Sequence, residues 1–232
     1  MKIVHIITGL GDGGAENTLF KICKYDFSNK HIIISLKGRG KYYSLLKKLG
    51  IQVYCLNFNL FSVHKFFFLI KLLLLIKPDI IQTWLILGDF IGGIASRLAG
   101  FKNIVWNIRY SNFEIKRVKL FNFIIIRLLS KLSYVVPKSI VVVSKKSKKL
   151  YEKKGYDKNK LQFIPNGYDL REIKKRKFKK LIKIKKNTPL VGYVARYDPL
   201  KDHLNLLNAL SLIKMKKINF YCLLIGYNIY NN

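Results

Sequence analysis

The sequence predicts an α/β protein with a doubly wound parallel sheet, followed by the start of a second unit of the same class. Short β-branched runs alternate with longer helical patterns over most of the 232 residues. The runs are apolar throughout rather than alternating with polar residues, which is typical of strands covered on both faces. A strongly basic segment interrupts the pattern late in the chain, and the alternation then resumes.

The first part of the chain contains seven strand candidates. They cover Lys2–Ile7, Ile32–Leu36, Gln52–Leu56, Ile80–Thr83, Ile104–Ile108, Ile140–Val143 and Leu161–Ile164. The helical stretches between them fall near 14–25, 41–49, 62–76, 89–99, 114–134 and 145–154. Strands joined through helices lie parallel to one another, so this order predicts one parallel sheet with helices on both faces.

The basic segment marks a domain boundary. Between Arg171 and Lys186 there are ten basic residues and one acid, Glu172, with little apolar periodicity. Such a charge run is typical of a solvated helix or a linker. We therefore predict a first domain over 1–170 and a basic linker over 171–187.

The remaining residues, 188–232, begin a second unit. We expect a strand at Leu190–Ala195, a turn through Pro199, a helix from about 200 to 213 and a strand at Phe220–Ile225. A β-α-β unit of about 40 residues is small for an independent domain. The sequence therefore predicts a second domain that is cut short.

The charge balance restricts the partners that the protein can have. The chain carries 44 Lys and Arg against 12 Asp and Glu, a formal net charge of +32. Such an excess predicts attraction to nucleic acid, to an anionic lipid surface or to phosphorylated small molecules. A compositional bias in which Lys merely solvates the surface explains the charge equally well. Disorder is excluded, because half of the residues are hydrophobic.

Neither a secretory signal nor a spanning helix is indicated. The apolar run at the N-terminus is short and leads into glycines, and Phe66–Ile76 is interrupted by Lys71. A spanning helix needs about 20 apolar residues. The three cysteines lack the paired spacing of a disulfide framework or a zinc site. We expect a cytoplasmic protein with free thiols.

The helical stretch at 116–134 is basic and amphipathic. One face carries Lys116, Lys119, Asn122, Arg127, Ser130, Lys131 and Tyr134, and the other carries Leu120, Phe121, Ile124, Ile125 and Leu128. Such a helix can lie on anionic lipid. The alternative is an ordinary surface helix whose apolar face belongs to the core, and the sequence favours this alternative.

A glycine-rich turn follows the first strand. Gly9, Gly11, Gly13 and Gly14 precede Glu16, which falls in the first turn of the next helix. Glycines here allow a ligand to approach the backbone, and a helix N-terminus favours anionic groups. The spacing matches the dinucleotide pattern only in part, and a tight turn for strand–helix packing is the alternative.

Four phrases in order resemble the retaining GT-B glycosyltransferases of family 4. They are GLGDGGAE, IIQTWLILGDFIGGIASRLAG, IPNGYDL and GYVARYDPLKDHLNLLNAL. The resemblance implies two Rossmann-like domains that face each other across a cleft, the first mainly for the acceptor and the second mainly for the nucleotide-sugar. It also implies a reaction that needs no metal and no other cofactor, since the nucleotide-sugar is a substrate.

The resemblance assigns Arg196 and Lys201 to the donor diphosphate. Both follow the first strand of the second unit, and cations at this place stabilise the negative charge of a departing diphosphate. Arg can bind two phosphate oxygens at once, whereas Lys acts as a compact charge.

Further residues follow from the same resemblance. The glycine turn, Gly11, Gly13 and Gly14 with Glu16, would border the cleft; acceptor-side candidates are Trp84, Asp89, Asn107 and Arg109; and Asn166 and Gly167 would form a loop at the hinge. The chain departs from the family where relatives carry histidines, at Leu87 and near Tyr110, and we expect the paired glutamates of the family to lie beyond residue 232. No catalytic residue is assigned.

We therefore expect a transferase that uses a UDP- or GDP-sugar and a glycan or lipid-linked acceptor in surface polysaccharide or glycolipid synthesis. It would lie in the cytoplasm, at times against the inner face of the cytoplasmic membrane. One alternative is an inactive, truncated remnant that binds membrane or a partner. The other is a basic nucleic-acid-binding protein, for which the chain shows no helix-turn-helix, zinc-finger spacing or RNA-binding motif.

Overall fold

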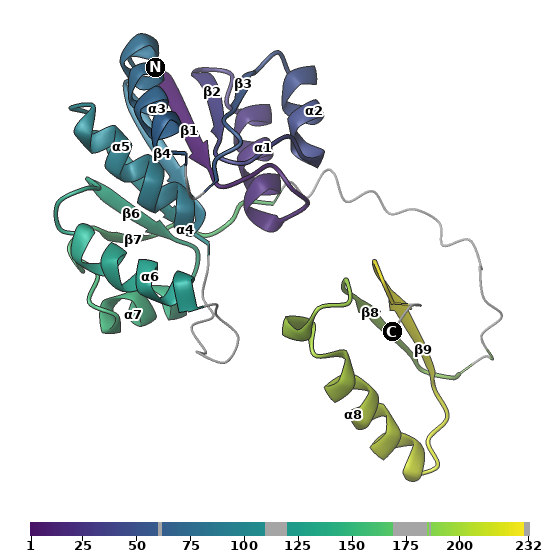
Figure 1. The fold of residues 1–232 in the computed structure, drawn as a ribbon. Helices are drawn as coiled ribbons and strands as arrows, with labels where there is room; N and C mark the ends of the chain where they lie inside the picture. Colours follow the sequence, from purple (N-terminus) through teal and green to yellow (C-terminus); the bar gives the residue numbers. More distant parts are fainter. Residues whose placement is uncertain (60–61, 110–119, 169–184, 186, 230–232) are drawn as a thin grey trace. The chain divides into compact units, whose positions relative to one another are not determined.

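The computed structural model describes residues 1–59, 62–109, 120–168, 185 and 187–229 (Figure 1). Contacts within the chain divide it into two units, Met1–Tyr168 and Asp169–Asn232.

Unit 1 is built on a seven-stranded sheet. The strands are β1 (Lys2–Ile7), β2 (Lys30–Ser35), β3 (Gln52–Cys55), β4 (Ile80–Trp84), β5 (Ile104–Ile108), β6 (Ser139–Val142) and β7 (Leu161–Phe163). Their order is β3-β2-β1-β4-β5-β6-β7, and every neighbouring pair is parallel. The predicted doubly wound α/β fold is confirmed. Its strand order reverses between β1 and β4, the point at which such sheets bind ligands beyond the carboxyl ends of their strands.

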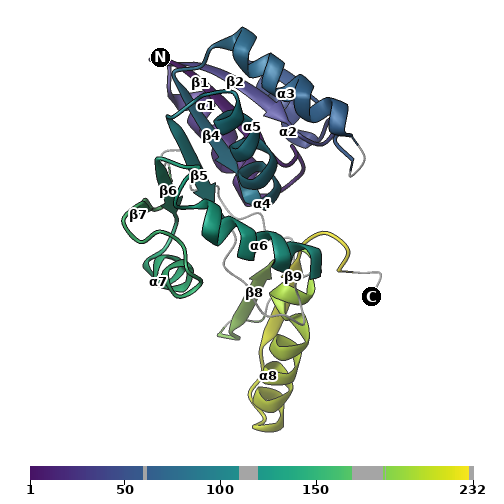
Figure 2. The same ribbon diagram turned by 60° about the vertical axis from the view of Figure 1, so that its left-hand side comes forward.

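Helices cover both faces of this sheet (Figures 1 and 2). They are α1 (Gly14–Tyr25), α2 (Lys41–Lys48), α3 (Val63–Ile76), α4 (Leu85–Leu87), a π-helical turn (Gly88–Gly92), α5 (Gly93–Leu98), α6 (Leu120–Leu132) and α7 (Lys145–Lys153). Leu19 of α1 and Leu46 of α2 pack with Ile33 on one face. Leu69 of α3 packs with Ile6 on the opposite face. Because successive strand residues point to opposite faces, both faces of β1 and β2 require apolar side chains.

Two adjacent glycines explain how closely the chain after β4 approaches the sheet. A Cβ on Gly92 would lie 2.7 Å from Ile6 Cγ2, and a Cβ on Gly93 would lie 2.8 Å from Trp106 Nε1. Both separations are shorter than packed carbon and nitrogen atoms tolerate. The glycines of the GDFIGG stretch thus serve the packing of this segment against β1 and β5.

Helix α6 buries a different face from the expected one. Of its described side chains, Ile125, Leu129 and Ser130 are buried, whereas Ile124 and Leu128 are exposed. The predicted apolar face is therefore wrong at Ile124 and Leu128, and the predicted polar face is wrong at Ser130. The face that remains outside combines apolar and basic side chains. Lys116 and Lys119 lie outside the described residues.

Unit 2 is a β-α-β arrangement, as the sequence predicts. Its strands β8 (Leu190–Val194) and β9 (Tyr221–Ile225) are parallel, and between them lie a 3₁₀ turn (Pro199–Lys201) and α8 (His203–Met215). The connection from β8 to α8 contains Arg196 and Lys201.

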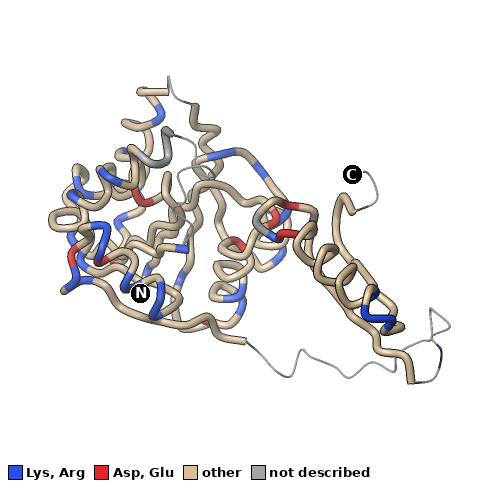
Figure 3. The backbone as a smooth tube through the Cα atoms, turned by 90° about the horizontal axis from the view of Figure 1, so that it is seen from below, with Lys and Arg blue, Asp and Glu red and all other residues tan. Residues whose placement is uncertain are grey.

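Within the described residues, basic side chains lie on many of the helices and loops (Figure 3), and α7 alone carries Lys145, Lys146, Lys148, Lys149 and Lys153. In the part of the chain that the structure describes, no helix has both the length and the apolar character needed to cross a membrane.

Candidate functional site

The carboxyl ends of β1, β4 and β5 bring several of the predicted residues to one edge of the sheet in unit 1. The glycine-rich turn follows β1, Trp84 is the last residue of β4, and Arg109 comes directly after β5. Because β1 and β4 are neighbours at the switch point, this edge is the candidate site.

The glycine-rich turn is tied to the helices on both sides of it. Gly13 is the N-cap residue of α1, and a Cβ there would lie 2.3 Å from Glu16 Oε2, so glycine makes room for the Glu16 carboxylate. Asp12 forms an exposed ion pair with Lys41 at 2.8 Å. Gly11 and Gly14 are exposed, and an added Cβ on Gly14 would meet no atom within 4 Å. A side chain at Gly13 would have to displace the Glu16 carboxylate, whereas Gly11 and Gly14 are open to a ligand.

Arg109 is held in place from three sides. Its Nε donates to Asn107 Oδ1 at 2.7 Å, and its Nη1 donates to Asn166 Oδ1. Its guanidinium carbon lies 5.1 Å from the centre of the Trp84 ring, a cation–π distance. Partial burial lowers the pKa of Arg109 to about 10, so the group stays charged at neutral pH. The structure thus brings Trp84, Asn107, Arg109 and Asn166 together.

The other predicted residue of the hinge loop, Gly167, is exposed, and an added Cβ on it would meet no atom within 4 Å. Asn166 connects this loop to the site through the hydrogen bond that it accepts from Arg109. Its role as a hinge stays a prediction.

Asp89 lies beneath this edge and not on it. It is 3% exposed, and Thr83 Oγ1 donates to its Oδ1 at 2.5 Å. Burial raises the pKa of Asp89 to about 8, so its carboxyl group is mostly protonated at pH 7. It lines a small cavity together with Arg109, Tyr151 and Tyr156. Asp89 therefore supports the site from below, and contact with an acceptor would need a rearrangement.

A hydrogen-bonded chain of buried side chains runs from Trp84 through His5 to His31, which faces Asp26, and the sequence did not predict it. Trp84 Nε1 donates to His5 Nδ1 at 3.2 Å, and His5 Nε2 lies 2.9 Å from His31 Nδ1. His31 Nε2 then lies 3.3 Å from Asp26 Oδ2, too poorly aligned for a hydrogen bond. The chain starts at the carboxyl end of β4 and finishes near the amino end of β2.

The protonation of this chain follows from its first donor. An indole N–H can only donate, so His5 Nδ1 accepts and the proton of the neutral ring sits on Nε2. His5 Nε2 then donates to His31 Nδ1, which places the proton of His31 on Nε2, facing Asp26. Burial, with His31 as the next contribution, lowers the pKa of His5 to about 3. Hydrogen bonds from Ser28 and Asn29 lower the pKa of Asp26 to about 2 and keep it ionised.

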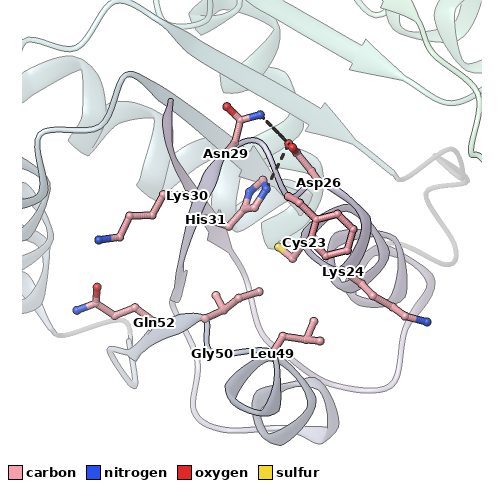
Figure 4. A pocket seen from close by; sticks show the side chains of 11 residues that line it. Cys23, Lys24, Asp26, Asn29, Lys30, His31, Leu49, Gly50 and Gln52 are labelled. Carbon is pink, nitrogen blue, oxygen red and sulfur yellow. Dashed lines mark hydrogen bonds and ion pairs between the residues drawn. The ribbon is translucent and has the colours of Figure 1, made fainter.

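The same region contains three potential metal ligands, His5, Cys23 and His31. Figure 4 shows His31, Cys23 and Asp26 at a surface pocket of about 420 Å³, and potential ligand atoms of His5, Cys23 and His31 lie within 4.8 Å of one another. However, three of the four ring nitrogens already take part in hydrogen bonds. Burial raises the pKa of the Cys23 thiol to about 12, so it keeps its proton. These groups fit a hydrogen-bonded network better than a metal centre.

The predicted donor residues lie together in unit 2. Arg196 donates from Nε and Nη2 to Asp198 Oδ2, at 3.2 and 2.9 Å, and its side chain is 58% exposed. Lys201 is also exposed, and its backbone carbonyl accepts from the Tyr193 hydroxyl. The Asp198 carboxylate therefore occupies the part of Arg196 that would hold a diphosphate.

His203, which begins α8, was also missed. It is 7% exposed, and neither of its ring nitrogens has a hydrogen-bond partner among the described residues. Its ring centre lies 5.1 and 5.4 Å from those of Tyr193 and Tyr197. The sequence shows only that His203 follows Lys201 by two residues, and nothing in the sequence pattern indicates its burial.

Comparison with known proteins decides the family. The sequence profile of Glycosyltransferase Family 4 matches residues 4–172. The chain belongs to this family. No curated protein sequence matches it.

Solved structures confirm the GT-B fold of this family 4 member. Anabaena HepE in complex with UDP-glucose is 17% identical, with a TM-score of 0.72 over 98% of this chain and 69% of that one. A glycosyltransferase from Rickettsia africae is 22% identical, with a TM-score of 0.71 over 97% and 60%. Acinetobacter baumannii MurG is 14% identical, with a TM-score of 0.58 over 99% and 69%. At these identities the likeness concerns the fold alone.

Proposed function

We propose that this family 4 chain transfers a sugar, with retention, from a UDP- or GDP-sugar to a glycan or lipid-linked acceptor in surface polysaccharide or glycolipid synthesis. The family match over 4–172 carries the proposal. The UDP-glucose complex of HepE supports a nucleotide-sugar donor. A structure described as a lipopolysaccharide outer core galactosyltransferase, with a TM-score of 0.61, supports an acceptor of the surface-glycan class.

Arg196 and Lys201 would bind the donor diphosphate. To do so, Arg196 has to exchange its bonds to Asp198 for bonds to phosphate oxygens. Its high exposure makes this exchange inexpensive, because a solvent-exposed ion pair contributes only about 0–1 kcal/mol. The two cations would then stabilise the leaving diphosphate, and we propose that the reaction needs no metal and no other cofactor.

Contact with an anionic membrane would bring the protein to a lipid-linked acceptor. The outward face of α3 carries Phe67, Phe68, Leu74 and Leu75 around Lys71, and all five are exposed. Phe67 and Leu75 are 63% and 71% exposed, and α3 contains no acidic residue. Apolar side chains with interspersed Lys are suited to the interface of an anionic bilayer. We propose that α3, together with the outer face of α6, rests on the inner face of the cytoplasmic membrane.

The experiment is a nucleotide-release assay with a panel of UDP- and GDP-sugars and bacterial glycolipid extracts. We expect one donor to release its nucleoside diphosphate, an unchanged rate with EDTA, and a product anomer that matches the donor by NMR. Arg196→Gln should lower the rate at least tenfold, whereas Lys216→Gln, an exposed position after α8, should not. If no sugar nucleotide binds or reacts, and the protein instead binds duplex DNA tightly at physiological salt, the proposal is wrong.

A further inference from the structure

We propose that Arg109 is an anion-binding residue of the acceptor site, and that the acceptor carries a phosphate or carboxylate group there. The identification of the anion as part of an acceptor rests on the proposed function, whereas the binding of an anion by Arg109 does not. It is carried by the hydrogen bonds and the charge around the guanidinium group.

The guanidinium group is fixed but not saturated. It has five N–H donors, and the contacts to Asn107 and Asn166 use one on Nε and one on Nη1. Within the described parts of the chain, no acceptor takes the other three. Arg is suited to two-point binding of phosphate or carboxylate, and a guanidinium that is already oriented loses less freedom on binding.

Among the described residues, none compensates the positive charge of Arg109. Both groups that hold Arg109 are neutral amides, and no carboxylate among the described residues lies within ion-pair distance of it. Asp89 lines the same small cavity, but its carboxyl group is mostly protonated at pH 7. A partly buried cation without a counter-charge is costly unless an anion binds it. A structural Arg would more commonly be paired with an acid.

Arg109 lies where this type of fold binds its ligands. It follows β5 at the carboxyl edge of the sheet, next to the switch point. Its ring contact, Trp84, is fully buried and is fixed in turn by the hydrogen bond to His5. The guanidinium therefore lies on a rigid base, which is the arrangement that binds an anion with little reorganisation.

The test uses Trp84 as the reporter. The indole N–H groups of Trp84 and Trp106 give two NMR signals in the ¹⁵N-labelled chain. Inorganic phosphate, added at constant ionic strength with chloride as the reference, should shift the Trp84 signal with saturation. Trp106, buried in the core, should stay unmoved and report that the fold is intact. Arg109→Gln should weaken this binding at least tenfold, Arg109→Lys should give an intermediate affinity, and Lys216→Gln, an exposed position in unit 2, should leave it unchanged.

Glucose 1-phosphate, glucuronate and glucose distinguish the sources of the anion. Binding of glucose 1-phosphate or glucuronate that is lost in Arg109→Gln, with no response to glucose, supports the inference. The compound that binds shows whether the anion is a phosphate or a carboxylate. The inference is wrong if Arg109→Gln binds phosphate as the wild type does, or if chloride gives the same shift. Binding at Arg109 without any sugar transfer would refute the proposed function alone. Sugar transfer at an equal rate by wild type and Arg109→Gln would refute this inference alone.

Discussion

His5 Nε2 and His31 Nδ1 lie 2.9 Å apart on the face of the sheet that α1 covers, and Trp84 sets the direction of the hydrogen bond between them. The Trp84 indole occupies His5 Nδ1, so each imidazole donates through Nε2 and accepts through Nδ1. The two rings stack, with centroids 5.2 Å apart and an interplanar angle of 25°. The network therefore fixes both tautomers and the orientation of the indole beneath Arg109.

We predict that both histidines are neutral Nε2–H tautomers at pH 7. The ¹⁵N shifts of the ring nitrogens distinguish this tautomer from the Nδ1–H form and from the charged ring. His5→Phe should move the Trp84 indole signal, because it removes the acceptor, and should leave that of Trp106 nearly in place. An Nδ1–H tautomer at either ring would contradict the network, and so would displacement of the ring signals by equimolar zinc, which would show a metal centre.

The lowered pKa of His5 predicts a loss of stability in acid. The ring stays neutral in the folded protein down to a pH of about 3, whereas the unfolded chain takes up the proton near pH 6.5. Between these values the unfolded state binds more protons, so the free energy of unfolding falls as the pH decreases. Urea unfolding at pH 7, 6, 5 and 4 measures the slope. His5→Gln should reduce that slope relative to wild type; an unchanged slope would show that other groups cause it.

Asp89 predicts the opposite slope at higher pH. Its pKa is raised to about 8, from 3.8 in the unfolded state, so the folded protein binds more protons between these values. Stability contributed by this group is present at low pH and is lost as the pH rises toward 8. Asp89→Asn keeps the shape and removes the titration. The variant should therefore gain stability relative to wild type as the pH rises from 5 to 8 in urea unfolding; a difference that does not change with pH would refute the prediction.

The sequence predicts the strands well because their apolar, β-branched runs act locally. Lys2–Ile7 and Ile104–Ile108 have the predicted bounds. The buried hydrogen bonds between Trp84, His5 and His31 could not be predicted from the sequence. Alternation shows only that His5 shares a face with Ile3 and Ile7, whereas its contact with His31 depends on the register in which Ile3 pairs with His31. Register between strands arises from tertiary packing, so the pairing of the two histidines could not be predicted from either strand alone.

The candidate site, like the fold, could be predicted in part from the sequence. Trp84 and Arg109 follow neighbouring strands, so their meeting at one edge of the sheet could be expected from the fold. Asp89 differs because a π-helical turn replaces the start of the predicted 89–99 helix. This turn directs the Asp89 side chain inward to Thr83. A one-residue change of helical phase of this kind leaves no mark in a hydrophobic pattern.

Gly93 should be intolerant of even one added methyl group. In Gly93→Ala the Cβ would lie 2.8 Å from Trp106 Nε1 and 3.3 Å from Val136 Cγ1, both in the packed core. Overpacking of this kind costs about 1–3 kcal/mol. Gly14→Ala is the matched control, since its Cβ would meet no atom within 4 Å, and its effect should stay within about 0.5 kcal/mol. Chemical denaturation of the two variants compares these costs, and equal stabilities would refute the role given to Gly93.

The outward face of α3 predicts binding to anionic vesicles. Phe67 and Leu75 are largely exposed, and burying each at an interface would contribute about 1.5–3 kcal/mol. The double variant Phe67→Ser/Leu75→Ser should therefore lower co-sedimentation with phosphatidylglycerol vesicles at least tenfold. Phe27→Ser is the control, because Phe27 is 89% exposed but lies between α1 and β2. Replacing Lys71 by Gln should weaken binding at low salt more than at high salt, because exposed charges act through a screened potential. Equal binding by the double variant and the wild type would show that α3 does not contact the membrane.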